Sequence, residues 1–239
     1  MELYYWPGLQ GRGEFVRLLL EDAGLAYDDV ARRPESEGGG IAAVMRMRDA
    51  AGDSVAPFAP PILRADDLVI AQTAVVCEYV AIKCALAPTN EAQTWAARQH
   101  MQTLLDIVDE VHDTHHPIST SLTYEQQREA AMGAAQAFLD GRLQLRLAYC
   151  ERVIAAAGSA WMLGPGPLYP DFALFQLMSG LDYAFPQSMV AIRAELPLCT
   201  AVQAQIAARV GIKNYLESDR RVPFNSHGIF RHYPELDKP

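Results

Sequence analysis

The sequence predicts an α/β domain over residues 1–86, followed by an all-helical domain over residues 91–239. Three observations support this prediction. The chain begins with a strand, a helix and a second strand, which is typical of a crossover unit. A two-stranded hairpin and another helix follow, and beyond residue 91 the apolar residues recur only at helical spacing. From about residue 213 the chain is rich in Pro, Asn and His, which predicts an irregular tail.

The first strand, helix and strand are predicted from their boundaries. A short aromatic strand over residues 2–6 ends at Pro7 and Gly8, which favour a turn. Apolar residues recur at helical spacing through residues 11–24, and the glycine that ends this run suits a helix C-terminus. The next strand is predicted over residues 25–30.

The hairpin and its helix complete the α/β domain. Residues 61–63 and 68–70 are predicted strands, because both are apolar and an acidic turn separates them. Residues 72–86 carry an apolar stripe at helical spacing. The segment between the two halves of the domain has a glycine run and then a predicted helix over residues 41–50. The predicted order is therefore β-α-β, then β-β-α.

The all-helical domain is predicted from long runs at helical spacing that proline and glycine separate. Pro117 ends the first run, and Gly158 ends the second. The predicted helices span residues 91–116, 124–157, 171–183 and 198–210.

Composition narrows the class of protein. The 239 residues are 50% hydrophobic and 21% charged, which is typical of a soluble globular protein. The net charge of −9 disfavours nucleic-acid binding. No apolar run is long enough to span a membrane, and the first residues do not resemble a signal peptide. The four cysteines are scattered and form no CxxC pair, and with no secretion signal we predict a reducing, cytoplasmic compartment.

The start of the helix predicted at residue 72 is a candidate anion site. A helix N-terminus offers free backbone N–H groups and a partial positive charge, and Thr73 adds a hydroxyl. Gln72 and Thr73 therefore suit a carboxylate. The alternative is that Thr73 only caps the helix.

Two motifs, in this order, resemble the cytosolic glutathione S-transferase family. Tyr5-Trp6-Pro7 followed by GRGEFVRLLLEDAG is similar to the tyrosine-type members, of the sigma, pi or alpha kind and of bacterial style. Residues 61–73 are similar in length and pattern to the family's Pro-to-Gln-Ser/Thr signature. The resemblance implies a thioredoxin-like N-terminal domain, an all-α C-terminal domain and glutathione as co-substrate.

The resemblance gives Tyr5 the place of the catalytic tyrosine. A free thiol has a pKa near 8.5, so only a small fraction of it is thiolate at neutral pH. A hydroxyl that donates a hydrogen bond to the sulfur favours the anion and lowers that pKa. The alternative for Tyr5 is a core aromatic at a strand end. Tyr4 is expected on the opposite face of the strand, in a structural role.

The resemblance also implies a glutathione site. Pro61 matches the family's cis-proline, beside which the backbone pairs with the cysteinyl unit. Pro60 has no N–H, so one of these bonds cannot form, at a cost of about 0.5–1.5 kcal/mol. Gln72 and Thr73 would hold the γ-glutamyl end. The implied glutathione-binding residues are Arg12, Arg46, Pro60, Pro61, Gln72, Thr73 and Asp106.

Three of these assignments have alternatives. Arg12 is otherwise a surface arginine. Arg48 could replace Arg46 at the glycyl carboxylate, because the usual Trp and Lys have no clear match. Asp106 or Asp109 would reach the glutathione amine across a homodimer interface, and spacing does not choose between them.

The resemblance implies a pocket for a small hydrophobic electrophile, lined by Trp6, Leu9, His112 and His116. With His115, the two histidines stand at helical spacing in HDTHHP and could ligate a metal. No cysteine or carboxylate completes an obvious site. The sequence therefore predicts no metal. Contact of these histidines with the second substrate is the preferred interpretation.

The helical half resembles the family in one further element. Gly164 and Asp171 are similar to the buried cap of its central helix, with Leu168 in place of the usual Ser or Thr. Asp171 is therefore expected to be structural.

Three functions are weighed. The preferred one is conjugation of glutathione to small hydrophobic electrophiles. The second is a glutathione-dependent isomerase or peroxidase. The third is a ligand-binding protein that has the fold without catalysis. The missing N–H of Pro60 leaves this third function open.

Overall fold

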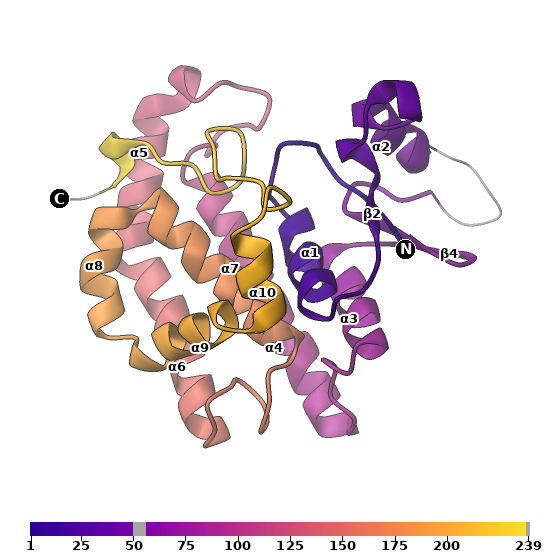
Figure 1. Cartoon of the computed structure of the whole chain (residues 1–239). Coiled ribbons are helices and arrows are strands. Elements are labelled where there is room, and N and C mark those ends of the chain that lie inside the picture. The colour runs from indigo at the N-terminus through magenta and orange to yellow at the C-terminus, as the bar shows by residue number, and fades with distance from the viewer. Residues whose placement is uncertain (50–55, 238–239) are drawn as a thin grey trace. The chain divides into compact units, whose positions relative to one another are not determined.

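The computed structural model describes residues 1–49 and 56–237 (Figure 1). The chain divides into two compact units, and its C-terminal residues contribute to both. Unit 1 comprises Met1–Ala87 with Arg209–Pro223, and unit 2 comprises Pro88–Ala208 with Phe224–Pro239.

Unit 1 is built around a four-stranded mixed sheet in the order β2-β1-β3-β4. β1 pairs in parallel with β2, where Leu3 is opposite Asp29, and antiparallel with β3, where Leu3 is opposite Leu63. β3 and β4 form the predicted hairpin. This arrangement confirms the order β-α-β, then β-β-α. The strands span Glu2–Tyr4 (β1), Asp28–Asp29 (β2), Ile62–Ala65 (β3) and Leu68–Ala71 (β4).

Helices pack on the sheet and on one another in unit 1. α1 buries its apolar residues and contacts both α3 and α10, while α2 contacts β1. Tyr4 packs beside α2 in a small core cluster with Val30, Ala43 and Ile62. The helices span Gly13–Asp22 (α1), Gly40–Asp49 (α2), Thr73–Lys83 (α3) and Val210–Leu216 (α10).

The strand predicted over residues 25–30 is much shorter in the structure. β2 covers only Asp28–Asp29, and a 3₁₀ turn follows at Val30–Arg32. The Asp29 carboxylate accepts a hydrogen bond of 2.7 Å from Nε of Arg17, and Val30 is buried. These two anchors turn the chain out of the sheet.

The prediction of an irregular tail from about residue 213 is wrong at its start. α10 continues to Leu216 and packs against α1. Its Tyr215 is fully buried and donates a hydrogen bond of 2.7 Å to Glu14, 201 positions earlier in the sequence. Arg209 also pairs with Asp22 at 2.7 Å. Local sequence patterns do not show partners this distant.

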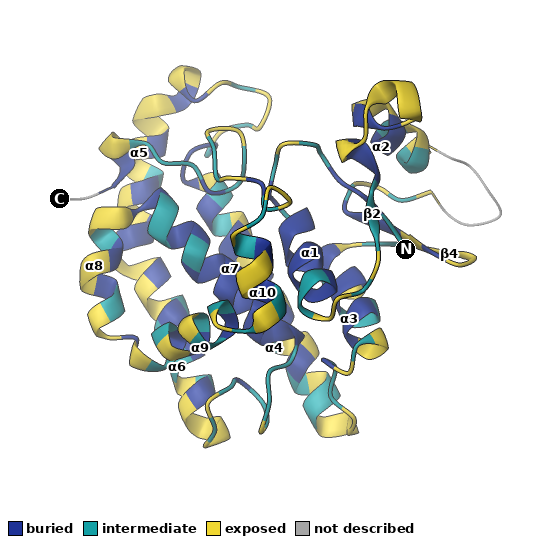
Figure 2. Cartoon of the chain, in the orientation of Figure 1, coloured by how far each residue is buried: buried dark blue, intermediate teal, exposed yellow. Residues whose placement is uncertain are grey.

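Unit 2 is helical in all of its described elements, as predicted. α7 is its most buried helix and contacts α4 and α9 (Figure 2). No helix among the described residues of either unit is long and apolar enough to cross a membrane. The main helices span Glu91–Asp113 (α4), Arg128–Ala137 (α5), Leu143–Ala157 (α6), Tyr169–Ala184 (α7), Pro186–Ala194 (α8) and Pro197–Ala207 (α9).

Two details of the helices differ from the sequence prediction. The helix expected over residues 124–157 contains a π-helical turn at Phe138–Arg142, which separates α5 from α6. The sequence pattern does not predict α8. Its Pro186 is at the first helical position, where a backbone N–H is not needed, so this proline begins a helix.

Asp171 holds the start of α7, which confirms its structural role. Its buried carboxylate accepts hydrogen bonds from the backbone N–H groups of Met162 (2.9 Å) and Leu168 (2.8 Å). Burial raises the pKa of Asp171 to about 6, although these N–H groups favour the ionised form.

Candidate active site

Tyr5 directly follows β1 and is buried, with 5% of the residue exposed. Its phenolic oxygen accepts a hydrogen bond of 2.8 Å from the backbone N–H of Arg12. That bond uses an oxygen lone pair, so the hydroxyl hydrogen is free to be donated to another acceptor. The backbone N–H of Arg12 therefore orients the phenol as a donor.

Two glycines make room for this phenol. A Cβ at Gly11 would lie 2.1 Å from the Tyr5 hydroxyl oxygen, and one at Gly13 would lie 2.5 Å from Cγ of the ring. Gly11 also has φ of +45°, which residues with a side chain rarely adopt. The backbone between β1 and α1 therefore approaches the Tyr5 ring so closely that only glycine fits at these two positions.

Desolvation keeps the phenol neutral. Burial raises the pKa of Tyr5 above its ordinary value, while the hydrogen bond from Arg12 and the charge of Arg17 act in the opposite direction. At neutral pH the hydroxyl therefore carries its proton and serves as a hydrogen-bond donor rather than a base.

A buried arginine supports the loop that carries this geometry. The Arg17 guanidinium lies 5.7 Å from the centroid of the Tyr5 ring and donates to the Leu9 carbonyl at 3.1 Å. It also pairs with Glu14 at 3.2 Å and with Asp29 at 2.7 Å. The sequence motif contains Glu14 and Arg17, but nothing in its pattern shows that they brace Tyr5.

The loop has a second anchor in the C-terminal part of unit 1. The side-chain amide of Gln10 donates a hydrogen bond of 2.5 Å to the Val222 carbonyl, and Arg221 pairs with Glu14 at 2.5 Å. Both contacts join residues more than 200 positions apart. They could not be found from local sequence.

The expected cis-proline lies at the start of β3. The Pro60–Pro61 bond is cis, with Pro61 buried and Pro60 half-buried. The missing N–H of Pro60 therefore lies beside the strand edge that the sequence assigned to glutathione.

Gln72 and Thr73 begin α3. Gln72 is exposed, has φ of +71° and occupies the cap position, where its side chain makes no capping hydrogen bond. Thr73 is the first helical residue and is buried. Since Gln72 rather than Thr73 occupies the cap position, the alternative in which Thr73 only caps the helix is disfavoured.

The basic candidates lie in different surroundings. Arg12 is half-buried beside Tyr5. Arg46 is exposed, donates to the Gly38 carbonyl at 3.1 Å and lines a pocket of about 270 Å³ with Tyr4. Arg48 pairs with Asp49 at 2.6 Å. Arg46 is thus beside Tyr4 rather than Tyr5.

Both acidic candidates of unit 2 are exposed on α4. Asp106 lies 3.9 Å from Arg146, and its side chain is 60% exposed. Asp109 is also exposed. Their surroundings do not distinguish them, so the choice stays a prediction.

The residues of the expected electrophile pocket belong to different units. Trp6 and Leu9 are half-buried in the loop of unit 1. His112 is half-buried and His116 is buried, both at the end of α4 in unit 2. Their shared role at a second substrate stays a prediction.

The sequence and fold were compared with known proteins. The family model described as "Glutathione S-transferase, C-terminal domain" matches residues 112–219. A glutathione S-transferase of Plasmodium falciparum is 23% identical, covering 90% of this chain and 93% of that protein. Glutathione S-transferase P 1 of Xenopus laevis is 25% identical, covering 92% of each.

The fold has counterparts among solved structures. The Pi-class glutathione S-transferase of Onchocerca volvulus superposes with a TM-score of 0.70 at 19% identity, covering 94% of this chain and 97% of that one. This likeness confirms the thioredoxin-like domain followed by an all-α domain. Together, the matches show that the chain is similar to glutathione S-transferases over most of its length.

Proposed function

We propose that this chain is a glutathione transferase that joins the glutathione sulfur to small hydrophobic electrophiles. The relatives named as glutathione S-transferases support a glutathione transferase enzyme. The hydrogen bond from Arg12 N–H to the Tyr5 oxygen carries the proposal, because it leaves a neutral phenol with its hydrogen available.

The chemistry follows from that donor. The Tyr5 hydroxyl donates a hydrogen bond to the sulfur of bound glutathione, which favours the thiolate and lowers the thiol pKa. The thiolate attacks an electrophilic carbon, forms a C–S bond and displaces the leaving group with its electron pair. The thiol proton passes to solvent. A hydrogen bond to a charged partner contributes about 1.5–3 kcal/mol, so the expected effect on rate is about 10- to 100-fold.

Binding of the peptide is assigned to the edge of the sheet and the start of α3. The first backbone N–H groups of α3 suit the γ-glutamyl carboxylate, and the buried Thr73 and exposed Gln72 begin that helix. The cis Pro60–Pro61 segment would pair with the cysteinyl unit through a single backbone bond. Arg12 and Arg46 supply the positive charge.

The remaining expectations form part of the same proposal. The enzyme is a cytoplasmic homodimer of the tyrosine type, in which Asp106 reaches the glutathione amine of the partner subunit. Sedimentation equilibrium tests the dimer. Asp106→Asn should raise KM for glutathione, and the effect of Asp109→Asn compared with it decides which of the two carboxylates reaches the amine.

The activity is tested with glutathione and an activated aryl halide. Tyr5→Phe should lower kcat/KM about 10- to 100-fold while circular dichroism stays unchanged. Tyr4→Phe is the matched control, since Tyr4 donates to Glu2 at 2.7 Å and belongs to the core cluster. Equal turnover in wild type and Tyr5→Phe would contradict the proposed role.

The two other functions give different outcomes in the same assay. An isomerase or peroxidase would show Tyr5-dependent turnover only with isomerisable substrates or organic hydroperoxides. A ligand-binding protein would bind glutathione and show no Tyr5-dependent turnover with any of these substrates.

A further inference from the structure

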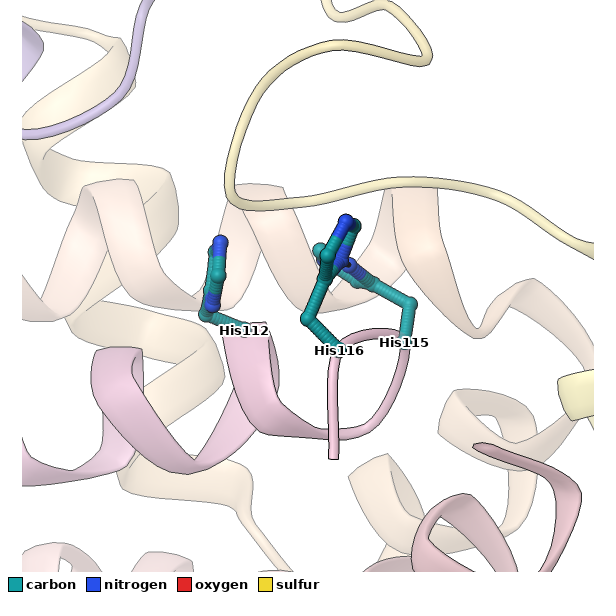
Figure 3. A group of neighbouring side chains, drawn as sticks. All are labelled: His112, His115 and His116. Atoms are coloured by element: carbon teal, nitrogen blue, oxygen red, sulfur yellow. Dashed lines mark hydrogen bonds between the residues drawn. The ribbon is translucent and has the colours of Figure 1, made fainter. Parts of the chain in front are cut away.

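Three histidines gather at the C-terminal end of α4. One ring nitrogen from each of His112, His115 and His116 lies within 4.8 Å of the other two. Figure 3 shows the His112 and His116 rings nearly parallel, with the His115 ring behind them. His115 is 1% exposed, whereas the His112 side chain is 27% exposed and gives access from solvent.

A backbone contact fixes the tautomer of the most buried histidine. Nε2 of His115 lies 2.7 Å from the carbonyl oxygen of Ile229. A carbonyl only accepts hydrogen bonds, so Nε2 carries a hydrogen and Nδ1 presents a lone pair in the neutral ring. Metal-binding histidines usually have this arrangement, in which the second ring nitrogen donates to a carbonyl or carboxylate.

That lone pair points at a second ring nitrogen. Nδ1 of His115 and Nδ1 of His116 are 2.5 Å apart. Two lone pairs cannot face each other so closely, so in this structure Nδ1 of His116 carries a hydrogen and donates it to Nδ1 of His115. A metal ion would take the place of this hydrogen once the two nitrogens move apart.

We propose that His112, His115 and His116 form a binding site for a divalent transition metal, with Zn²⁺ as the ion to test. Three neutral imidazoles suit Zn²⁺, Cu²⁺ or Ni²⁺, and zinc accepts three histidines with water as the fourth ligand. At Zn–N distances of about 2.0–2.1 Å, tetrahedral ligand nitrogens are about 3.3 Å apart. On metal binding, the distance between the His115 and His116 nitrogens therefore increases slightly, and the longer distances within the cluster decrease.

The C-terminal segment completes the surroundings of the site. Tyr233 lies beside His115, with ring centroids 6.3 Å apart, and stacks on Tyr124 at 3.8 Å. Phe230 is buried next to Ile229, so the carbonyl that orients His115 belongs to a packed segment. This support is the feature that the sequence motif HDTHHP does not show, and it favours a metal site where the sequence predicted no metal.

The nearby charges act in opposite directions. An Asp113 carboxylate oxygen lies 3.9 Å from Nδ1 of His112 and favours a cation. The Arg231 guanidinium donates to the Gly228 carbonyl at 2.8 Å and disfavours positive charge on His115 and His116. Replacing Arg231 by a neutral residue should therefore strengthen metal binding severalfold.

The test uses the full chain without a histidine tag, stripped of metal by a chelator. Calorimetry with Zn²⁺ should give one site per chain. Co²⁺ should give the intense visible absorption of a tetrahedral ion. His112→Ala should weaken Zn²⁺ binding at least about tenfold and abolish that absorption. This half-buried position is chosen first because His115→Ala would disturb the core.

Two further variants make the result specific. His100→Ala, on the same helix, is the matched control and should bind Zn²⁺ as tightly as wild type. Arg231→Gln should bind more tightly. If Zn²⁺ does not bind, or if His112→Ala binds as tightly as His100→Ala, the cluster is a hydrogen-bonded histidine pair and the metal site is refuted.

Discussion

The backbone N–H of Arg12 donates a 2.8 Å hydrogen bond to the phenolic oxygen of Tyr5. This bond joins the cap residue of α1 to the residue that directly follows the first strand. It occupies the acceptor side of the hydroxyl, so the hydroxyl hydrogen is left for a ligand. The proposed chemistry depends on this relationship, and the first two predictions test it.

Gly11→Ala should remove activity through the phenol. Its Cβ would lie 2.1 Å from the Tyr5 oxygen, so the ring or the turn has to move. Gly8→Ala is the matched control, because Gly8 also has a positive φ but has open space around its Cβ position. Both variants should lose about 1–2 kcal/mol of unfolding free energy from backbone strain. Only Gly11→Ala should lose turnover, and equal turnover in the two variants would argue against the packing role of Gly11.

The ionisation of Tyr5 should occur above the ordinary tyrosine pKa of about 10, because its phenol is buried. Since the folded pKa is the higher one, this group stabilises the fold fully below pH 10, and that stability is lost as the pH rises through the folded pKa. Difference absorbance of tyrosinate between wild type and Tyr5→Phe measures it. A Tyr5 signal that titrates below pH 10 would show a solvated phenol instead.

Asp171→Ala should destabilise unit 2. The substitution leaves the buried N–H of Met162 and the half-buried N–H of Leu168 without their acceptor, at about 1–3 kcal/mol for a buried group. Denaturant unfolding at pH 8 is the measurement, because the carboxyl, with a pKa of about 6, is ionised there. A loss smaller than about 1 kcal/mol would mean that water replaces the carboxylate.

Gly180→Ala should loosen the C-terminal segment of unit 2. A Cβ at this position in α7 would lie 2.4 Å from the ring of Phe230, which is 2% exposed. Overpacking of this kind costs about 1–3 kcal/mol. Gly133→Ala in α5, where the Cβ position is open, should instead leave the helix equally or more stable. Thermal unfolding of the two variants separates them, and the same melting temperature in both would contradict the tight contact.

Regular patterns in the sequence predicted much of the fold. Alternation along the first strand placed Tyr4 and Tyr5 on different sides, and the structure packs Tyr4 with Ile62 and Tyr5 against Gly11. The pattern over residues 61–73 likewise predicted the hairpin and the start of α3. These features are local, so the sequence contains them directly.

Other features depend on partners far away in the chain. Tyr215 belongs to unit 1 because it reaches Glu14, and His115 is oriented by the carbonyl of Ile229. Neither contact has a periodicity or spacing that a sequence pattern could show. The sequence also does not show which residue a charged side chain lies beside. Arg46, for example, lies beside Tyr4 in the structure.

The most direct test of the central claim is the thiol pKa of glutathione bound to the enzyme, followed through thiolate absorbance as the pH is raised. With wild type, the pKa should fall below the reference value of about 8.5, and with Tyr5→Phe it should return toward that value. An unshifted thiol pKa in wild type, or the same lowered value in both proteins, would contradict the assignment of Tyr5 as the donor.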